Sequence, residues 1–249
     1  MNREIWQLHV TESGCPPWPC PTCGLGVVVL VPGSVALGET GKSMRDRSHP
    51  GWEPEWVHYV FTAQGRCTNP GCGEAFALGG TGDVVDDFDP EAGPSWADLL
   101  SPRFCIPMPD VIRIPGDCPG SVRAALRHAF SLLWTNPSAC AGRLRVALEA
   151  VMDSRGIPKA KLDKRGRSRP VSLHSRIKAL SDVEPSLVDQ LIGVKWLGNA
   201  GSHDNQVDQE SLLDGLEVLE YVLQQLIERP SHKLTLLAND LTARWGGEW

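Results

Sequence analysis

The sequence predicts an α+β fold in which an N-terminal β lobe precedes an all-α helical bundle. Residues 1–118 are rich in glycine and proline and hold short apolar runs, whereas residues 119–229 hold long segments of helical period and few prolines. Paired cysteines within the first part further indicate a metal site there. We therefore expect two domains, over residues 1–104 and 105–249.

Composition limits the function classes. The chain has 249 residues, of which 41% are hydrophobic, and a net charge of −6, so it is expected to be globular with no general attraction to nucleic acid. The longest aliphatic run, VVVLV, is far too short to cross a bilayer, and the first residues lack a secretory apolar segment. We expect a cytoplasmic protein without membrane contact. Its eight cysteines then suit metal binding or buried thiols better than disulfides.

Two apolar runs of the lobe, 26–31 and 56–63, are short, β-branched and aromatic, which predicts strands. Between residues 83 and 98 there are six acids and no base, which predicts a solvated, loop-like connector at the end of the lobe. After it, apolar spacing and capping residues predict helices over 119–134, 136–156, 172–182, 185–198, 208–230 and 232–245. In the fifth of these, five leucines at helical spacing form one core-facing stripe.

The strongest chemical signal is CPTCG, with Cys20 and Cys23, followed by CTNPGCG, with Cys67 and Cys72. Each pair makes a turn in which two thiolates converge, and four thiolates suit tetrahedral zinc. The pattern predicts a zinc ribbon with one structural zinc ion per chain. Cys15 is interpreted as a bystander, although it could replace Cys20.

The segment ALGETGKS, residues 36–43, nearly matches a phosphate-binding loop, but its first position is Ala36. Such a loop must open a helix, and the next residues contain two prolines and no apolar period. We therefore expect a mobile loop here.

A basic segment runs from Arg155 to Lys178 and holds nine Lys and Arg residues against the single acid Asp163. Such a run can neutralise phosphates, and we assign candidate nucleic-acid contacts to its centre: Lys164, Arg165, Arg167 and Arg169. A solvated loop between two helices would look the same.

Four motifs occur in the order CPTCG, IPGDCPGSVRAALRHAF, GRLRVALEAVM and KWLGNAGSHD. With these motifs the chain resembles the prokaryotic domain of unknown function 4145, whose helical part is similar to the HEPN superfamily. The resemblance implies a HEPN-like helical bundle, a homodimer formed through the helical domain, and a place in anti-phage or restriction systems beside a partner protein. Active members of the superfamily cleave RNA without metal, using an arginine and a histidine.

On this pattern His203 matches the histidine and Asn199 the polar residue, whereas the arginine position falls on Gly198. Lys195, Asn199 and His203 are spaced by four residues and share one face of a helix, so Lys195 could supply the missing charge. Alternatively, the small residues let two helices approach, and Asn199 and His203 bond to Arg145 and Glu149 on the helix over 136–156.

Two functions follow. In the first, the chain is a non-catalytic or regulatory dimeric module whose zinc ribbon and basic segment bind RNA, DNA or a partner protein. In the second, it is a metal-independent endoribonuclease that uses His203 with Lys195 and Asn199.

Overall fold

The computed structural model of the chain describes residues 1–89, 93–202, 206–228 and 230–246. The chain forms the α+β fold that its sequence predicts, and it divides into two compact units. The lobe unit comprises residues 2–111 with the segment Phe130–Asn136, and the helical unit comprises Met1 with residues 112–129 and 137–249.

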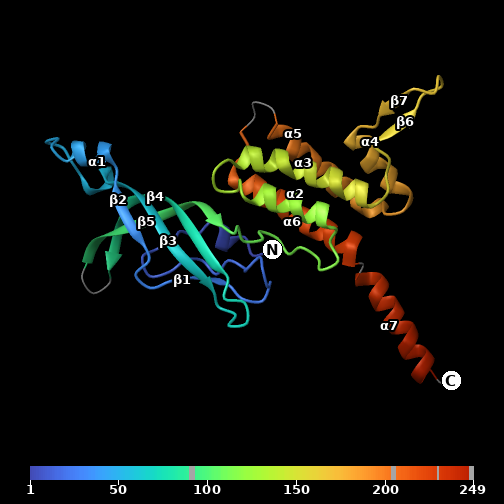
Figure 1. Cartoon of the computed structure of the whole chain (residues 1–249), viewed down its shortest axis with the longest axis horizontal. Coiled ribbons are helices and arrows are strands. Elements are labelled where there is room, and N and C mark those ends of the chain that lie inside the picture. Colours follow the sequence, from blue (N-terminus) through green and yellow to red (C-terminus); the bar gives the residue numbers. More distant parts are fainter. Residues whose placement is uncertain (90–92, 203–205, 229, 247–249) are drawn as a thin grey trace. The chain divides into compact units, whose positions relative to one another are not determined.

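One antiparallel sheet forms the lobe unit, with strands in the order β1-β3-β4-β5 and with β2 also paired to β3 (Figure 1). The strands are β1 (Val28–Leu30), β2 (Ala36–Glu39), β3 (His58–Cys67), β4 (Ala75–Asp89) and β5 (Gly93–Ile106). Short 3-10 turns cover Glu4–Trp6 and Pro54–Trp56. The strands predicted over 26–31 and 56–63 are confirmed as β1 and β3. Val28 pairs with Cys67, so the end of β3 is fixed next to β1.

The described residues of the acidic segment, 83–89 and 93–98, are strand, so the prediction of a loop-like connector is wrong there. Residues 83–89 complete β4 and residues 93–98 begin β5. Strand pairing uses backbone groups, and the side chains of Asp86 and Asp87 stay exposed while Asp83 pairs with His58, so a run of acids does not oppose it. In the register of these two strands no acid lies opposite another acid, which removes the repulsion that would otherwise separate them.

Three tryptophans from distant parts of the sequence meet in the lobe unit. The ring centroids of Trp6, Trp18 and Trp134 lie 5.0–6.4 Å apart. Trp18 is fully buried, and its indole N–H donates to the carbonyl of Ile5 at 2.8 Å, which satisfies the polar end of the ring. Trp134 explains why the segment Phe130–Asn136 joins this unit.

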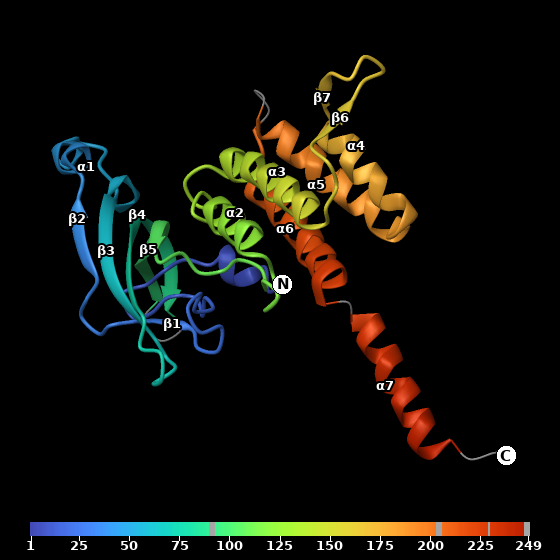
Figure 2. The ribbon, with the colours of Figure 1, turned by 45° about the vertical axis from the view of Figure 1, so that its right-hand side comes forward.

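The helical unit contains α2 (Gly120–Phe130), α3 (Pro137–Ser154), α4 (Leu173–Lys178), α5 (Val188–Ala200), α6 (Gln209–Leu223) and α7 (Pro230–Trp245). Helices α3, α5 and α6 pack against one another (Figure 2). Two predicted end signals are confirmed: Asp208 caps α6 by accepting from the N–H of Ser211 at 2.7 Å, and Gly156 has φ +71° just after α3. 3-10 turns over Ala179–Asp182 and Pro185–Leu187 join α4 to α5.

The fifth predicted helix is interrupted. After Leu223 it continues as a π-helical turn, η5 (Gln224–Glu228), and Pro230, expected to stop the helix, is the first residue of α7. The leucine stripe is confirmed as core, because all five members are at most 1% exposed: Leu212, Leu216, Leu219, Leu223 and Leu226. No helix in the described ranges combines the length and apolarity that a membrane span requires.

Candidate metal centre and nucleic-acid interface

The four predicted cysteine ligands meet at one end of the lobe unit. The Sγ atoms of Cys20, Cys23, Cys67 and Cys72 all lie within 4.8 Å of one another. Cys20 is 3.8 Å from Cys72, and Cys23 is 3.7 Å from Cys67, so each turn contributes to both close pairs. These four thiolates could hold a metal ion.

Two similar turns bring the thiolates together. The N–H of Gly24 donates to the carbonyl of Cys20 at 2.9 Å, and the N–H of Gly73 donates to that of Asn69 at 3.0 Å. Gly24 and Gly73 adopt φ +64° and +59°, the left-handed conformation that glycine enters without strain. The equivalent places of these glycines in the sequence thus reflect equivalent backbone turns.

Backbone amides also point at two of the sulfurs. The N–H of Gly26 donates to Cys23 Sγ, and the N–H of Asn69 donates to Cys67 Sγ, both at 3.4 Å. The amides of Gly26 and Leu25 lower the pKa of Cys23 to about 6, since they stabilise the thiolate. Sequence reasoning missed Gly26, where a Cβ would lie 2.5 Å from Cys67 Sγ. The signal was present, because Gly26 lies three residues after Cys23, inside the expected turn.

Cys15 lies outside this cluster, as expected of a bystander. Its thiol donates to the carbonyl of Val28 at 3.5 Å, and burial raises its pKa to about 11. The three remaining cysteines are buried free thiols: Cys105, Cys118 and Cys140. Burial alone raises the pKa of Cys140 to about 12, so this thiol stays protonated at neutral pH.

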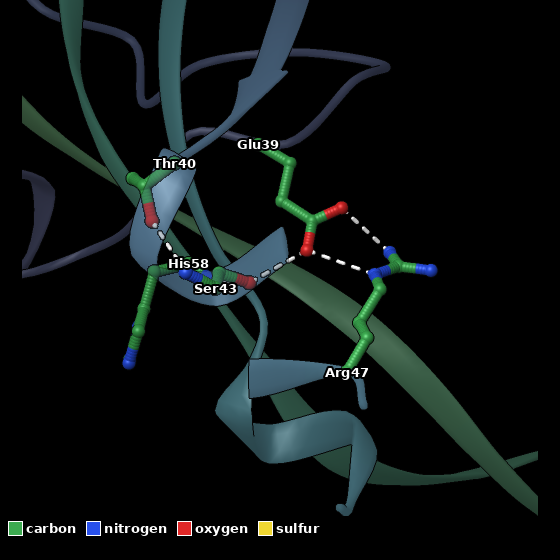
Figure 3. A network of polar contacts seen from close by, with 5 residues as sticks. All are labelled: Glu39, Thr40, Ser43, Arg47 and His58. Carbon is green, nitrogen blue, oxygen red and sulfur yellow. Dashed lines mark hydrogen bonds and ion pairs between the residues drawn. The ribbon is translucent and has the colours of Figure 1, made fainter. Parts of the chain in front are cut away.

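The near match to a phosphate loop forms a short helix, α1 (Gly41–Asp46), rather than the expected mobile loop. Thr40 caps it, and the Ser43 hydroxyl donates to Glu39 at 2.7 Å while accepting the N–H of His58 at 3.2 Å (Figure 3). Arg47 holds the same carboxylate through two nitrogens, at 2.6 and 2.9 Å (Figure 3). Ser43 is fully buried in this network, so its hydroxyl is committed to the lobe and does not serve a nucleotide.

The basic segment is partly a β-hairpin, which the sequence did not predict. Strands β6 (Ala160–Leu162) and β7 (Ser168–Pro170) pair, and the hairpin projects from the helices between α3 and α4 (Figures 1 and 2). The four predicted contact residues are all exposed: Lys164, Arg165, Arg167 and Arg169.

Asp163 organises the turn of this hairpin. Its carboxylate accepts the backbone N–H groups of Arg165 and Arg167 at 2.8 and 3.0 Å, and it contacts the Nε atoms of Arg167 and Arg169 at 3.1 and 3.3 Å. The N–H of Arg167 is the main cause of the lowered pKa of Asp163. Because both side-chain contacts use Nε, the terminal nitrogens of each guanidinium are left for a further acceptor.

One base of the segment has a different role. Arg176 is 3% exposed and donates to the Asp153 carboxylate at 2.6 Å and to the carbonyl of Ile157 at 2.8 Å. Lys159 contacts the same carboxylate at 2.7 Å. Arg176 therefore fastens α4 to the end of α3 and is not part of an interface.

The end of α5 brings Lys195 and Asn199 beside α3. Asn199 Oδ1 accepts from Arg145 Nη1 at 3.3 Å, and Arg145 lies 3.7 Å from Glu149. Lys195 is only 8% exposed, with Nζ 3.2 Å from the centroid of the Trp196 ring. Burial first, and the charge of Arg145 second, lower the pKa of Lys195. His203 lies outside the described residues.

Two glycines let α5 approach α3 closely. A Cβ at Gly198 would lie 3.0 Å from both the carbonyl oxygen of Ala141 and Cβ of Arg145, and a Cβ at Gly201 would collide with the carbonyl of Ser138. Gly198, which stands where the HEPN pattern has its arginine, thus has a packing role. A guanidinium is nevertheless present beside Asn199, supplied by Arg145 from α3, 54 residues earlier in the chain.

Comparison with known proteins gives two family matches. A model described as domain of unknown function DUF8608 matches residues 8–105, and one described as domain of unknown function DUF4145 matches residues 127–243. No curated protein matches the chain. No solved structure matches it either. The resemblance to domain 4145 is confirmed over 127–243, whereas sequence reasoning missed the separate N-terminal family. The helical part of the chain is therefore similar to DUF4145, and its lobe is similar to DUF8608.

Proposed function

We propose that the chain is a zinc-stabilised nucleic-acid-binding protein that contacts the phosphate backbone through the hairpin β6–β7. The observation that carries this function is the row of exposed cations on that hairpin. The zinc ribbon and the HEPN-like bundle belong to the same proposal.

Zinc is the metal that best fits the four thiolates. With Zn–S distances of 2.3 Å, the sulfurs of a tetrahedral site lie about 3.8 Å apart. The two closest pairs, at 3.8 and 3.7 Å, already have this separation, and the amides of Gly26 and Leu25 favour the thiolate of Cys23. Four protein ligands leave no open position, so the ion stabilises the fold and does not catalyse.

Elemental analysis of the purified protein tests the metal. We expect about one zinc per chain, and Cys67→Ser should lose it. Cys15→Ser is the matched control and should retain it. Zinc content that is absent from the wild type, or unchanged by Cys67→Ser, would contradict the ligand set.

The arrangement of charge on the hairpin favours an anionic partner. Lys161 and Arg169 are paired directly across the two strands. Like charges in such positions repel and weaken a hairpin unless an anion lies between or beside them. Asp163 neutralises part of this positive charge through its ion pair with Arg169. A phosphate backbone would neutralise the remainder, because guanidinium groups bind phosphate through two parallel hydrogen bonds.

Salt-dependent binding of labelled duplex RNA, single-stranded RNA and duplex DNA tests this interface. Each lost phosphate contact lowers the salt slope by about 1, so Lys164→Gln with Arg165→Gln should lower it by about 2. The control is Lys42→Gln with Arg45→Gln, which removes the same charge from the exposed surface of α1. Equal binding by both double variants, or no binding by the wild type at low salt, would overturn the interface.

A metal-independent endoribonuclease is the second candidate, and Lys195 is the observation that favours it. Its ammonium is largely buried beside a second cation, Arg145, and no described carboxylate pairs with it. A phosphate group would relieve this repulsion. Asn199 accepts a hydrogen bond from Arg145, and His203 follows four residues later in the sequence. The cation Lys195, the polar group Asn199 and the base His203 would therefore all come from one short segment of the chain.

Incubation of the purified protein with RNA in the presence of a chelator tests the second candidate. Cleavage should occur in the wild type and be lost in His203→Ala and Lys195→Gln, while Arg143→Ala, an exposed change on α3, leaves it intact. RNA that stays whole with the wild type rejects the ribonuclease and leaves the binding function standing. The homodimer and the defence-system partner stay predictions of the same proposal.

A further inference from the structure

Helix α7 presents an apolar stripe to solvent. Every described side chain from Leu234 to Trp245 is exposed. Leu234, Leu237, Leu241 and Trp245 follow helical spacing and lie along one face, while Leu236 lies on the opposite face. A helix of 16 residues is only marginally stable in water by itself, so this stripe requires a surface to pack against.

A groove of matching character lies between α5 and α6 in the same unit. It has a volume of about 480 Å³ and is lined by Asp189, Gly193, Val194, Leu197, Asp214 and Val218 among others. Along α5 the lining runs from residue 189 to 197, which is about 12 Å of helix. The stripe from Leu234 to Leu241 covers about 10 Å, so the lengths agree. Gly193 leaves the floor open, since a Cβ there would meet no atom within 4 Å.

The connection decides which groove α7 can reach. Only residue 229 separates η5 from α7. A chain needs a loop of two to five residues to reverse between antiparallel helices, so α7 cannot lie back along its own α6 without unwinding a turn. We propose that α7 seats its leucine stripe in the α5/α6 groove of a second copy of this chain, with the two arms exchanged reciprocally.

Reciprocal exchange closes the assembly at two copies, because each arm and each groove is then filled. It also buries twice the area that one docked arm would bury. Stable specific interfaces bury roughly 1,200–2,000 Å², so two docked arms favour a stable dimer more than one. The inference extends the homodimer of the proposed function to a specific surface. Its failure is separable from failure of nucleic-acid binding, because the hairpin β6–β7 remains exposed in a monomer and its salt slope is measured separately.

Light scattering of the full chain at about 10 µM tests the exchange. The wild type should be a dimer. Leu237→Asp should weaken dimerisation by at least about tenfold, as expected when a charge replaces a buried leucine. Leu236→Asp makes the same change on the opposite face of α7 and should remain dimeric.

The groove is tested from the other side. Gly193→Phe fills the groove and should give monomers, whereas Gly116→Phe, at another glycine with open space around it, should not. A mixture of Leu237→Asp and Gly193→Phe retains one intact arm and one intact groove, and it should form heterodimers. A monomeric wild type, including one that binds anionic vesicles, or a dimeric Gly193→Phe would overturn the exchange.

Discussion

Gly26 lies between the two cysteine turns in the sequence. The Sγ atom of Cys67 leaves no room for a side chain at this position. A Cβ there would lie 2.5 Å from Cys67 Sγ and 2.8 Å from the backbone nitrogen of Asn69. We predict that Gly26→Ala displaces Cys67 and lowers metal content well below that of the wild type, measured by elemental analysis. Gly14→Ala, in open space in the same unit, is the control. Equal metal content in both variants would show that the turn adjusts.

Asp153 gives the helical unit a pH-dependent link between α3 and α4. The hydrogen bond from Lys159, together with that from Arg176, holds the pKa of Asp153 below its ordinary value of 3.8. A lowered pKa in the folded state adds stability above pH 3.8, and this stability is lost as the pH falls through the folded pKa. We predict that Asp153→Asn costs about 2 kcal/mol at pH 7, because it leaves the buried Arg176 charge without its partner.

Denaturant unfolding at several pH values checks this prediction. The difference between Asp153→Asn and the wild type should shrink below pH 3.8, where the wild-type carboxyl is also protonated. Lys159→Ala removes only the exposed partner and should cost less than about 1 kcal/mol. A cost for Asp153→Asn that stays constant down to pH 2 would show that its charge is not the cause.

At the level of elements, the contact between α5 and α3 depends on small residues. Gly201 has φ −66°, which alanine adopts freely, but a Cβ there would collide with the carbonyl of Ser138 and approach Ala141 at 2.9 Å. We predict that Gly201→Ala destabilises the helical unit by about 1–3 kcal/mol. Gly193→Ala, inside α5 and with open space around it, should instead stabilise it by up to about 1 kcal/mol. Thermal unfolding of the two variants measures the difference, and shifts of equal sign would contradict this account.

The sequence predicts some elements better than others, for physical reasons. Helices α3, α5 and α6 follow from a long apolar period and from local end signals such as Asp208 and Gly156. The sequence does not predict the paired ends of strands β4 and β5. Their pairing is made by backbone groups, and the acidic side chains at 83–98 neither favour nor oppose that pairing. The hairpin β6–β7 escapes for the same reason, since its side chains are exposed throughout.

The candidate sites show the same division. Local spacing predicts the four cysteines, because each pair lies within one turn. The contact of Arg145 with Asn199 joins residues 54 positions apart, and it confirms the alternative that the sequence offers, in which small residues let two helices approach and Asn199 bonds to Arg145. Gly26 is intermediate: it lies in the expected turn, but its restriction comes from Cys67 and Asn69, more than 40 residues away.

For the whole molecule, the division into two units has a consequence for metal removal. The lobe unit has its own tryptophan centre and carries all four thiolates, whereas the helical unit has its own leucine core. A metal ion bound only by the folded lobe adds its binding free energy to the stability of that unit alone. A chelator should therefore lower the unfolding temperature of the lobe unit and leave that of the helical unit nearly unchanged.

Hydrogen exchange with and without chelator resolves the two units. Amides of β1 and of the Cys67 end of β3 should lose protection first, because Val28 and Cys67 pair directly beside the thiolates. Amides of α3, α5 and α6 should keep their protection, and readdition of zinc should restore the lobe. Loss of protection in α5 and α6 at the same chelator concentration would show that the metal supports both units, which is incompatible with two independent cores.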